Sequence, residues 1–94
     1  MTREQEVKIV RGIVDKRGER AQIIKAVEEM SELTHALCRY IGEDKPKAAD
    51  IVNACEEIAD VEIMLEQLKI IFDAGQVMAW KRDKLSRLAA LLET

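Results

Sequence analysis

The strongest constraint on this chain is the spacing of its apolar residues, which recur every three or four positions over long stretches. That spacing is the period of an amphipathic α-helix, whereas a half-buried β-strand alternates at every second residue. Residues that interrupt helices are few, because the chain contains one proline and four glycines, and only 3% of its residues are aromatic. These features together predict an all-α fold.

Four helices are expected, with approximate bounds 3–15, 20–41, 47–73 and 76–92. Gly18 and Gly42 stand where the first two helices would stop. Pro46 suits the start of the third helix, and Ala74–Gly75 is expected to close it. A chain of 94 residues forms one domain. We therefore predict a single helical domain over residues 1–94, similar to a four-helix bundle.

The third predicted helix carries more apolar surface than one neighbouring helix covers. Ile51, Ile58 and Leu65 mark one side of it, whereas Ile63 and Ile70 lie on others. A helix that packs on a single neighbour needs an apolar stripe only about 100° wide. We therefore expect dimerisation to complete the bundle, in a homodimer or a homotetramer.

Composition argues against several classes of protein. No apolar run approaches the ~20 residues of a membrane span, and the N-terminus has no apolar signal segment, so we expect a cytoplasmic protein without membrane association. Cys38 and Cys55 are then expected to be free, buried thiols. Residues 28–60 carry three Lys/Arg against nine Asp/Glu, which disfavours binding to a nucleic-acid duplex.

Two groups of acidic residues interrupt the apolar pattern in the middle of the chain. They are Glu28, Glu29 and Glu32 in the second helix, and Glu56, Glu57 and Asp60 in the third. Glu29 with Glu32, and Glu57 with Asp60, are spaced i, i+3 and so share a helix face. Helices joined by a short loop pack as antiparallel neighbours, which would bring both groups together. Four carboxylates at close quarters need protons or a cation, and an all-oxygen site suits Mg²⁺ or Mn²⁺.

The alternative is an ordinary solvated acidic surface, neutralised by Lys25, Arg39 and Lys47. A single acidic group on a surface helix is most simply interpreted in this way. Two groups on adjacent helices, each with apolar neighbours, favour the metal site instead.

The acidic groups also resemble the signature of a known family. Glu28-Glu29-x-x-Glu32 followed by Glu57-x-x-Asp60 is similar to the EExxE…ExxD motif of MazG-like, all-α nucleoside triphosphate pyrophosphohydrolases. The similarity, of the phage and bacterial type, extends through AQIIKAVEEMSELTHAL, EEIADVEIMLEQL and WKRDKLSRLAALL, about residues 21–92. It implies Mg²⁺-dependent hydrolysis of a (d)NTP to the monophosphate and pyrophosphate, in housekeeping or regulation of the nucleotide pool. It further implies that Glu29, Glu32, Glu57 and Asp60 ligate the metal, and that the protein is a dimer or a dimer of dimers.

Further roles follow from the same resemblance. Glu28 and Glu56 become candidates for positioning the attacking water or for supporting the metal ligands. Lys84 and Arg87, together with Lys81, are candidates for binding the substrate phosphates. The alternative for these three is a solvated basic turn, which the helix dipole favours near a C-terminus.

Other functions are alternatives to this interpretation. A phosphoribosyl-ATP pyrophosphohydrolase is of similar size, but its usual N-terminal substrate-binding stretch is not evident. A helical interaction module, whose acids merely solvate it, is the non-enzymatic alternative. A di-iron bundle is disfavoured because His35 is the only histidine, and a zinc site of His35, Cys38 and Cys55 would lack a fourth ligand. Trp80 is expected in the core or in an interface.

Overall fold

The computed structural model describes residues 1–94 and contains only helices, turns and loops. Its helices are α1 (Arg3–Arg17), α2 (Glu19–Gly42), α3 (Ala48–Ile71) and α4 (Ala74–Leu92). The predicted all-α, bundle-like fold is confirmed, and every predicted helix boundary lies within two residues of the observed one. None of these helices combines the length and the apolar character that a bilayer crossing requires.

Glycine and a capping threonine set the bounds of α1. The Thr2 hydroxyl accepts a hydrogen bond from the Gln5 backbone N–H at 3.1 Å, and the Thr2 N–H donates to Gln5 Oε1 at 2.8 Å. Gly18 is the single residue between α1 and α2, with φ 93°, and its N–H donates to the Val14 carbonyl at 2.8 Å. This positive φ strains any residue with a Cβ, so glycine permits the sharp turn here. The predicted stop at Gly18 is confirmed.

The predicted break at Ala74–Gly75 is wrong by two residues. α3 ends at Ile71, and Ala74 and Gly75 form the first turn of α4. Asp73 precedes that turn as its N-cap, and its Oδ1 accepts a hydrogen bond from the Gln76 N–H at 3.0 Å. A capping carboxylate satisfies an otherwise free backbone donor, so it starts the helix earlier than the glycine suggests.

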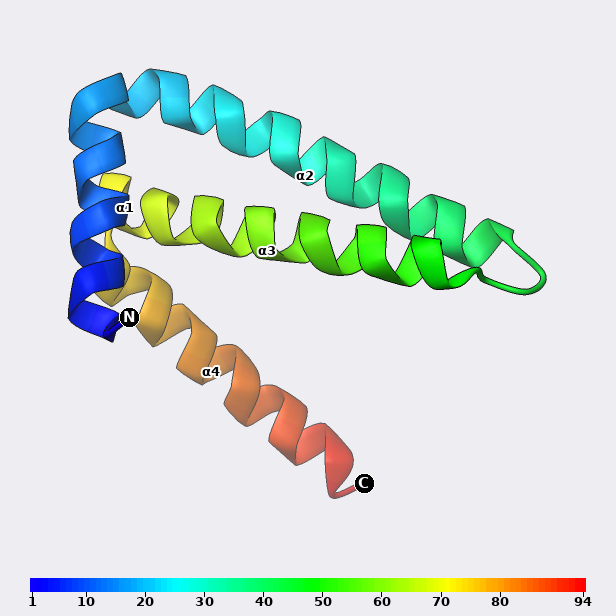
Figure 1. Cartoon of the computed structure of the whole chain (residues 1–94). Coiled ribbons are helices and arrows are strands. Elements are labelled where there is room, and N and C mark those ends of the chain that lie inside the picture. The colour runs from blue at the N-terminus through cyan, green and yellow to red at the C-terminus, as the bar shows by residue number, and fades with distance from the viewer.

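Helices α2 and α3 form an antiparallel hairpin and make most of the contacts between helices (Figure 1). α1 lies across the end of this hairpin that is remote from the 43–47 loop. The small side chains of Ala26 and Ala36 in α2 are buried, which allows α3 to approach closely. On α3, Met64 is buried. An ion pair between Arg3 and Glu66, at 2.8 Å, joins α1 to α3.

A buried pair of amides also joins α2 to α3. Gln22 Nε2 donates a hydrogen bond to Gln67 Oε1 at 2.6 Å, and each residue is only 3% exposed. We refer to Gln22 and Gln67 as the glutamine pair. Because a shift in register would separate two buried polar groups, the pair specifies how α2 and α3 align.

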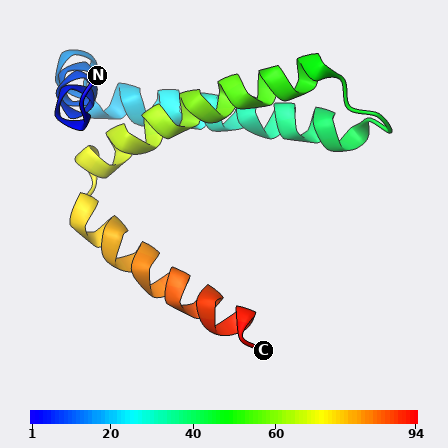
Figure 2. The same cartoon turned by 60° about the horizontal axis from the view of Figure 1, so that its bottom comes forward.

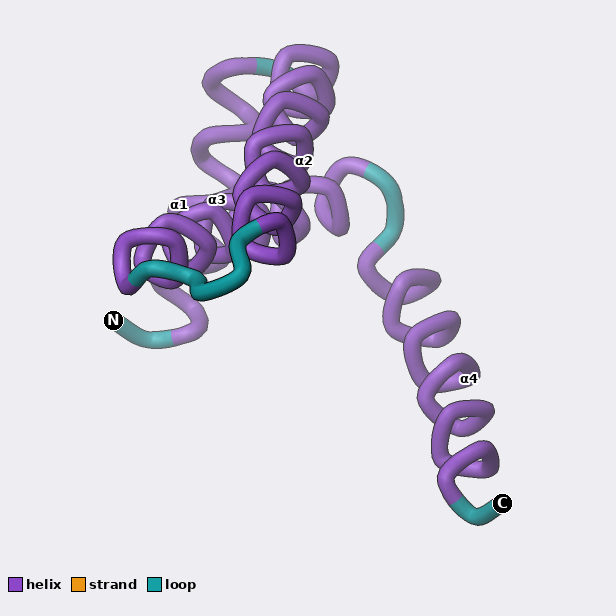
Figure 3. Tube along the Cα trace, turned by 90° about the vertical axis from the view of Figure 1, so that its right-hand side faces the viewer, coloured by secondary structure: helices purple, strands orange, loops and turns teal.

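Helix α4 departs from the other three. From the turn at Phe72–Asp73 it diverges from α3, and the two helices form an open V (Figure 2), while a view from the side shows α4 standing away from the hairpin (Figure 3). No residue of α4 is buried. The radius of gyration is 16.3 Å, compared with about 12 Å for a compact chain of this length. The single chain is therefore open rather than closed around one core.

This openness corrects the burial predicted for the two cysteines, and of the two places expected for Trp80 it excludes the core of the single chain. Cys38 and Cys55 are free, as predicted, but both are exposed rather than buried. Trp80 is 58% exposed, so it does not belong to a core within the single chain. The reason is common to all three residues, since a two-helix hairpin buries only the facing side of each helix and α4 covers neither outer side.

Candidate metal centre

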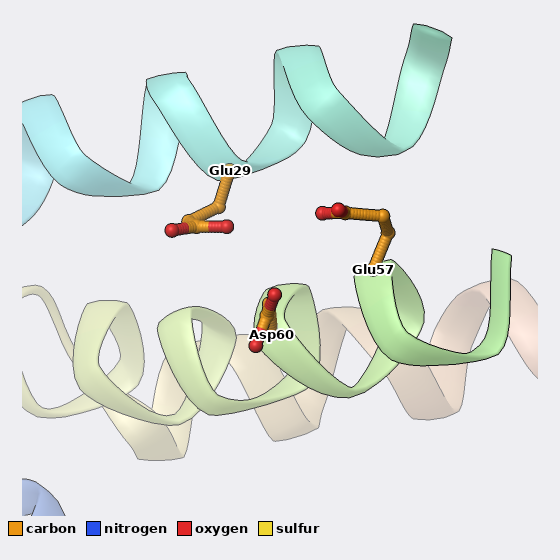
Figure 4. A group of neighbouring side chains, drawn as sticks. All are labelled: Glu29, Glu57 and Asp60. Atoms are coloured by element: carbon orange, nitrogen blue, oxygen red, sulfur yellow. The ribbon is translucent and has the colours of Figure 1, made fainter. Parts of the chain in front are cut away.

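The register of the hairpin brings Glu29 of α2 together with Glu57 and Asp60 of α3. One carboxylate oxygen of each residue lies within 4.8 Å of the others. Figure 4 shows Glu29 pointing from α2 towards α3, with Glu57 and Asp60 pointing back from α3. We refer to these three residues as the acidic cluster. Three of the four predicted metal ligands therefore meet in the structure.

The acidic cluster contains polar atoms without partners. The Glu29 side chain is only 12% exposed, and Glu57 and Asp60 are half-buried. Oε2 of Glu29 and Oε2 of Glu57 are both buried and accept no hydrogen bond. A buried acceptor without a donor costs about 1–3 kcal/mol, and a charged one more. The arrangement therefore requires a positively charged ligand, or protons, to be satisfied.

Glu32, the fourth predicted ligand, lies at the edge of this group. Its side chain is exposed, and its oxygens do not belong to the group of three that converges. The negative charge of Glu29 raises the pKa of Glu32, with further contributions from its side-chain contact with Glu29 and from the charge of Glu57. Glu32 is thus close enough for the charges of Glu29 and Glu57 to act on its carboxyl group.

Lys25 is the one cation that pairs with the acidic cluster. Its Nζ lies 3.2 Å from Glu29 Oε1, and this hydrogen bond is the main cause of the raised pKa of Lys25. The interpretation of Lys25 as an ion-pair partner is confirmed. Arg39 and Lys47 form no ion pair with the acidic residues. One ammonium group facing several carboxylates leaves the site negative.

The donor set matches a hard divalent cation. All the converging atoms are carboxylate oxygens, which Mg²⁺ and Mn²⁺ prefer over the nitrogen and sulfur ligands of zinc. Oxygens bound to one octahedral Mg²⁺ ion stand about 3–4 Å apart. The three oxygens lie within 4.8 Å of one another, which is somewhat wider than this spacing. The unpartnered oxygens of Glu29 and Glu57 supply ligand atoms that no other group occupies.

The remaining predicted site residues lie elsewhere. Glu28 and Glu56 are exposed and do not belong to the acidic cluster, although the charge of Glu28 contributes to the raised pKa of nearby Lys25. Each of them is the sequence neighbour of a cluster residue, and neighbours in a helix point about 100° apart. Their side chains therefore point away from the acidic cluster.

The basic residues of α4 are likewise exposed and are not brought to the acidic cluster within one chain. Arg87 pairs with Asp83 on the same helix at 2.7 Å, and Lys84 Nζ stands 6.0 Å from the centre of the Trp80 ring. Lys81 lines the groove between α3 and α4. The divergence of α4 at the Phe72–Asp73 turn is the physical reason for this separation.

The glutamine pair was not predicted, although the sequence carries a signal for it. Gln22 precedes Ala26 by four residues, and Gln67 follows Met64 by three, so both fall on the apolar stripes of their helices. A polar residue on each of two facing stripes is a candidate for a buried hydrogen bond.

Comparison of the chain with protein-family models, curated proteins and solved structures gives no match. Function is therefore inferred from the residues of the chain itself and from the motif similarity described above.

Proposed function

We propose that the protein is a Mg²⁺-dependent nucleoside triphosphate pyrophosphohydrolase that converts a (d)NTP to the monophosphate and pyrophosphate. The acidic cluster is the observation that carries this proposal, since it gathers three carboxylates and leaves two buried oxygens without partners. The similarity of residues 28–60 to the MazG-like signature supplies the reaction class. Such a role in the nucleotide pool belongs in the cytoplasm.

Glu29, Glu57 and Asp60 would hold the ion, with Glu32 completing the ligand set. Bound Mg²⁺ (or Mn²⁺) supplies charge to neutralise phosphate oxygens and lowers the pKa of a coordinated water. Lys25 holds Glu29 Oε1 in their ion pair, and the buried Oε2 of Glu29 has no partner and is available to an ion. These residues together bind and position the triphosphate end of the substrate.

Glu28 and Glu56 are proposed to position the attacking water or to support the metal ligands. Both are one residue from a metal ligand, and both face solvent in the single chain. Lys81, Lys84 and Arg87 are proposed to bind the substrate phosphates. Because α4 diverges from the acidic cluster, the basic residues that serve one cluster would come from a second copy of the chain.

A helical interaction module is the second candidate function. The observation in its favour is the exposed apolar side of α4, which has no buried residue. Mg²⁺-dependent turnover of a nucleotide distinguishes the two candidates. An interaction module whose acidic residues only face solvent would show no turnover.

The test is a panel of NTPs, dNTPs and phosphoribosyl-ATP incubated with Mg²⁺, Mn²⁺ or EDTA in oxygen-18 water. We expect one or more substrates to give pyrophosphate and a monophosphate that carries the label, because water attacks the α-phosphorus. EDTA should abolish the reaction. Label in orthophosphate with formation of a diphosphate would contradict the proposed cleavage, and full activity in EDTA would contradict the metal. No turnover of any nucleotide with either metal would leave the interaction module as the better account.

A further inference from the structure

A cavity of about 320 Å³ lies at the junction of three helices, and we refer to it as the junction cavity. Residues of α1, of the last turns of α3 and of the first turns of α4 line it. Figure 1 shows α1 and the start of α4 at the same end of α3. No Cα atom of α1 lies within 8 Å of a Cα atom of α4. The junction cavity therefore lies between two helices that no direct packing joins.

Cations outnumber carboxylates in the lining of the junction cavity. Its charged residues are Arg3, Arg11, Lys69, Lys81 and Glu66. Glu66 is already occupied, because its Oε2 lies 2.8 Å from Arg3 and its Oε1 lies 3.4 Å from Lys69. Arg3 has a second partner in Glu6, at 3.6 Å, and Glu6 does not line the cavity. Even when Glu6 is included, four cations stand against two carboxylates.

Two of these cations have no carboxylate partner. Arg11 of α1 and Lys81 of α4 form no ion pair, and they line one cavity from the two helices that do not pack on each other. A guanidinium binds the oxygens of a carboxylate through parallel N–H donors, and an ammonium adds a point charge. The lining therefore offers donors to an oxyanion that α1 and α4 would share.

The rest of the lining is apolar. Six aliphatic residues or methionines make it up: Val7, Val10, Ile70, Ala74, Val77 and Met78. Pockets for small organic ligands are mostly apolar, carry a few polar groups, and have volumes of about 300–1,000 Å³. A bare inorganic anion would leave the apolar lining in contact with water. The junction cavity fits a ligand that joins one anionic group to an apolar body.

The junction cavity is separate from the acidic cluster. On α3, Glu57 and Asp60 lie on the side that faces α2. Glu66 and Lys69 lie on roughly the opposite side, because successive residues of a helix point about 100° apart. The ion pair between Glu66 and Arg3 shows that this second side faces α1. A ligand in the junction cavity therefore does not contact the acidic cluster.

From these observations we propose that the junction cavity binds a small organic acid. Arg11 and Lys81 hold its carboxylate, and its apolar body lies against the aliphatic lining. Such a ligand bridges α1 and α4, and it thereby restrains the direction in which α4 leaves the hairpin. The proposal goes beyond the hydrolysis proposed above and does not rest on it, so it is tested without nucleotide or metal.

The first measurement compares three probes by calorimetry with the wild-type chain at low salt. They are 4-phenylbutyrate, its neutral analogue 4-phenylbutan-1-ol, and inorganic phosphate. We expect 4-phenylbutyrate to bind with a dissociation constant of about 1 mM or lower. The alcohol should bind at least about 10-fold more weakly, because it lacks the charge-assisted hydrogen bonds. Absence of binding, equal binding of the alcohol, or equal binding of phosphate would each overturn the proposal.

The second measurement places the ligand with a matched pair of variants. Arg11 lines the junction cavity and neither of the two larger cavities, whereas Lys8 is a second exposed cation of α1 that lines none of the three. We expect Arg11→Gln to weaken 4-phenylbutyrate binding at least about 10-fold. Lys8→Gln removes the same charge and should bind like the wild type. Both side chains are exposed, so both variants should keep the wild-type circular dichroism. If the two variants bind alike, the junction cavity is not the site.

The groove between α3 and α4 is the competing location for an apolar ligand. Leu88 lines that groove and not the junction cavity, so Leu88→Ala should bind 4-phenylbutyrate like the wild type. Loss of binding in Leu88→Ala with full binding in Arg11→Gln would place the ligand in the groove and would refute the proposal.

A third measurement tests the bridge between α1 and α4. Amide hydrogen exchange of residues 74–81 reports how often the first turns of α4 open. With 4-phenylbutyrate at ten times its dissociation constant, this exchange should slow by up to about 10-fold in the wild type. It should stay unchanged in Arg11→Gln at the same concentration. If the ligand binds to the wild type and leaves the exchange of α4 unaltered, it does not bridge the two helices.

Discussion

The glutamine pair and the acidic cluster lie in the same α2–α3 interface, but their polar atoms are satisfied in different ways. Gln22 Nε2 donates a hydrogen bond to Gln67 Oε1 at 2.6 Å, and both residues are almost completely buried. In the acidic cluster, Lys25 provides the only ion pair, and two buried carboxylate oxygens have no donor.

The difference comes from the chemistry of the two side chains. An amide carries donors and an acceptor, so two amides complement each other, whereas an ionised carboxylate only accepts. The glutamine pair therefore favours the folded hairpin without outside help. The acidic cluster opposes it, because like charges repel and their partial burial raises the cost. A group that disfavours its own fold is characteristic of a site kept for a ligand.

The largest effect expected from this comparison is on catalysis and metal binding. Glu57→Gln removes one ligand charge, so we expect at least about a 100-fold loss of Mg²⁺-dependent hydrolysis. Mg²⁺ at 100 times its dissociation constant should stabilise the wild type by about 2.7 kcal/mol, and the variant should lose most of this stabilisation. The metal-free variant should be at least as stable as the metal-free wild type, because repulsion is relieved. Kinetics and thermal unfolding with and without Mg²⁺ measure all three.

Glu62→Gln is the matched control, since Glu62 is an exposed carboxylate on the same helix that forms no ion pair. Its hydrolysis and its response to Mg²⁺ should equal those of the wild type. If the two variants behave alike, or if Mg²⁺ still stabilises Glu57→Gln fully, the acidic cluster is not the metal site.

A smaller effect is expected at the glutamine pair, and it should fall on stability alone. Gln67→Ala leaves the buried amide of Gln22 without its partner, at a cost of about 1–3 kcal/mol. Each kcal/mol corresponds to a fall of roughly 4–8 °C in the melting temperature of a domain of this size. The double variant Gln22→Leu with Gln67→Leu should recover most of the loss, because no polar atom is then stranded. Melting at fixed protein concentration without metal tests this order, and equal losses in the single and double variants would contradict it.

The smallest expected effect is on pH dependence, and its sign differs between two carboxylates. The pKa of Glu32 is raised, chiefly by the charge of Glu29, so the folded chain binds a proton there more readily than the unfolded chain. The contribution of Glu32 to the free energy of unfolding therefore increases as the pH falls from 7 towards the ordinary value of 4.5. Arg3 lowers the pKa of Glu66, so the stabilisation from that pair persists above pH 4.5 and is lost below it.

Urea unfolding of the metal-free wild type and Glu32→Gln at pH 7, 6 and 5 separates the first effect. Glu32→Gln should be the more stable protein at pH 7, because glutamine cannot repel Glu29. The gap should close as the wild-type carboxyl becomes protonated. A gap that widens towards pH 5 would reverse the sign and would argue against the repulsion between Glu29 and Glu32.

Most of the fold was predictable because the sequence marks where its helices stop. Gly18 supplies the positive φ of the first turn, and the loop after Gly42 contains the only proline. The exception at Ala74–Gly75 shows that a capping side chain outweighs a glycine, since Asp73 starts α4 before it. The divergence of α4 from the hairpin was not predictable. Its amphipathic pattern indicates an apolar side that packs against something, but not whether that is its own chain or another molecule.

The candidate site was predictable in part for a similar reason. The i, i+3 spacing places two carboxylates on one side of each helix, and antiparallel packing makes those sides face each other. The alignment of the two helices, to within one turn, determines which individual oxygens meet. That alignment is specified by the glutamine pair and not by the acidic pattern. Glu32 lies outside the converging group, whereas Glu29, Glu57 and Asp60 lie within it.

All four predicted ligands lie within residues 29–60, in one hairpin closed by the 43–47 loop. This has a consequence for the order in which the parts of the protein fold and associate. Contacts within a helical hairpin join residues close in sequence, and chains dominated by such contacts fold within microseconds to milliseconds. If α4 docks only on a second copy, its docking is bimolecular and slows on dilution. We expect stopped-flow refolding to show helix formation at a rate independent of protein concentration, followed by a change in Trp80 fluorescence whose rate is proportional to concentration. A tryptophan signal that follows helicity at every concentration would mean that α4 docks within its own chain.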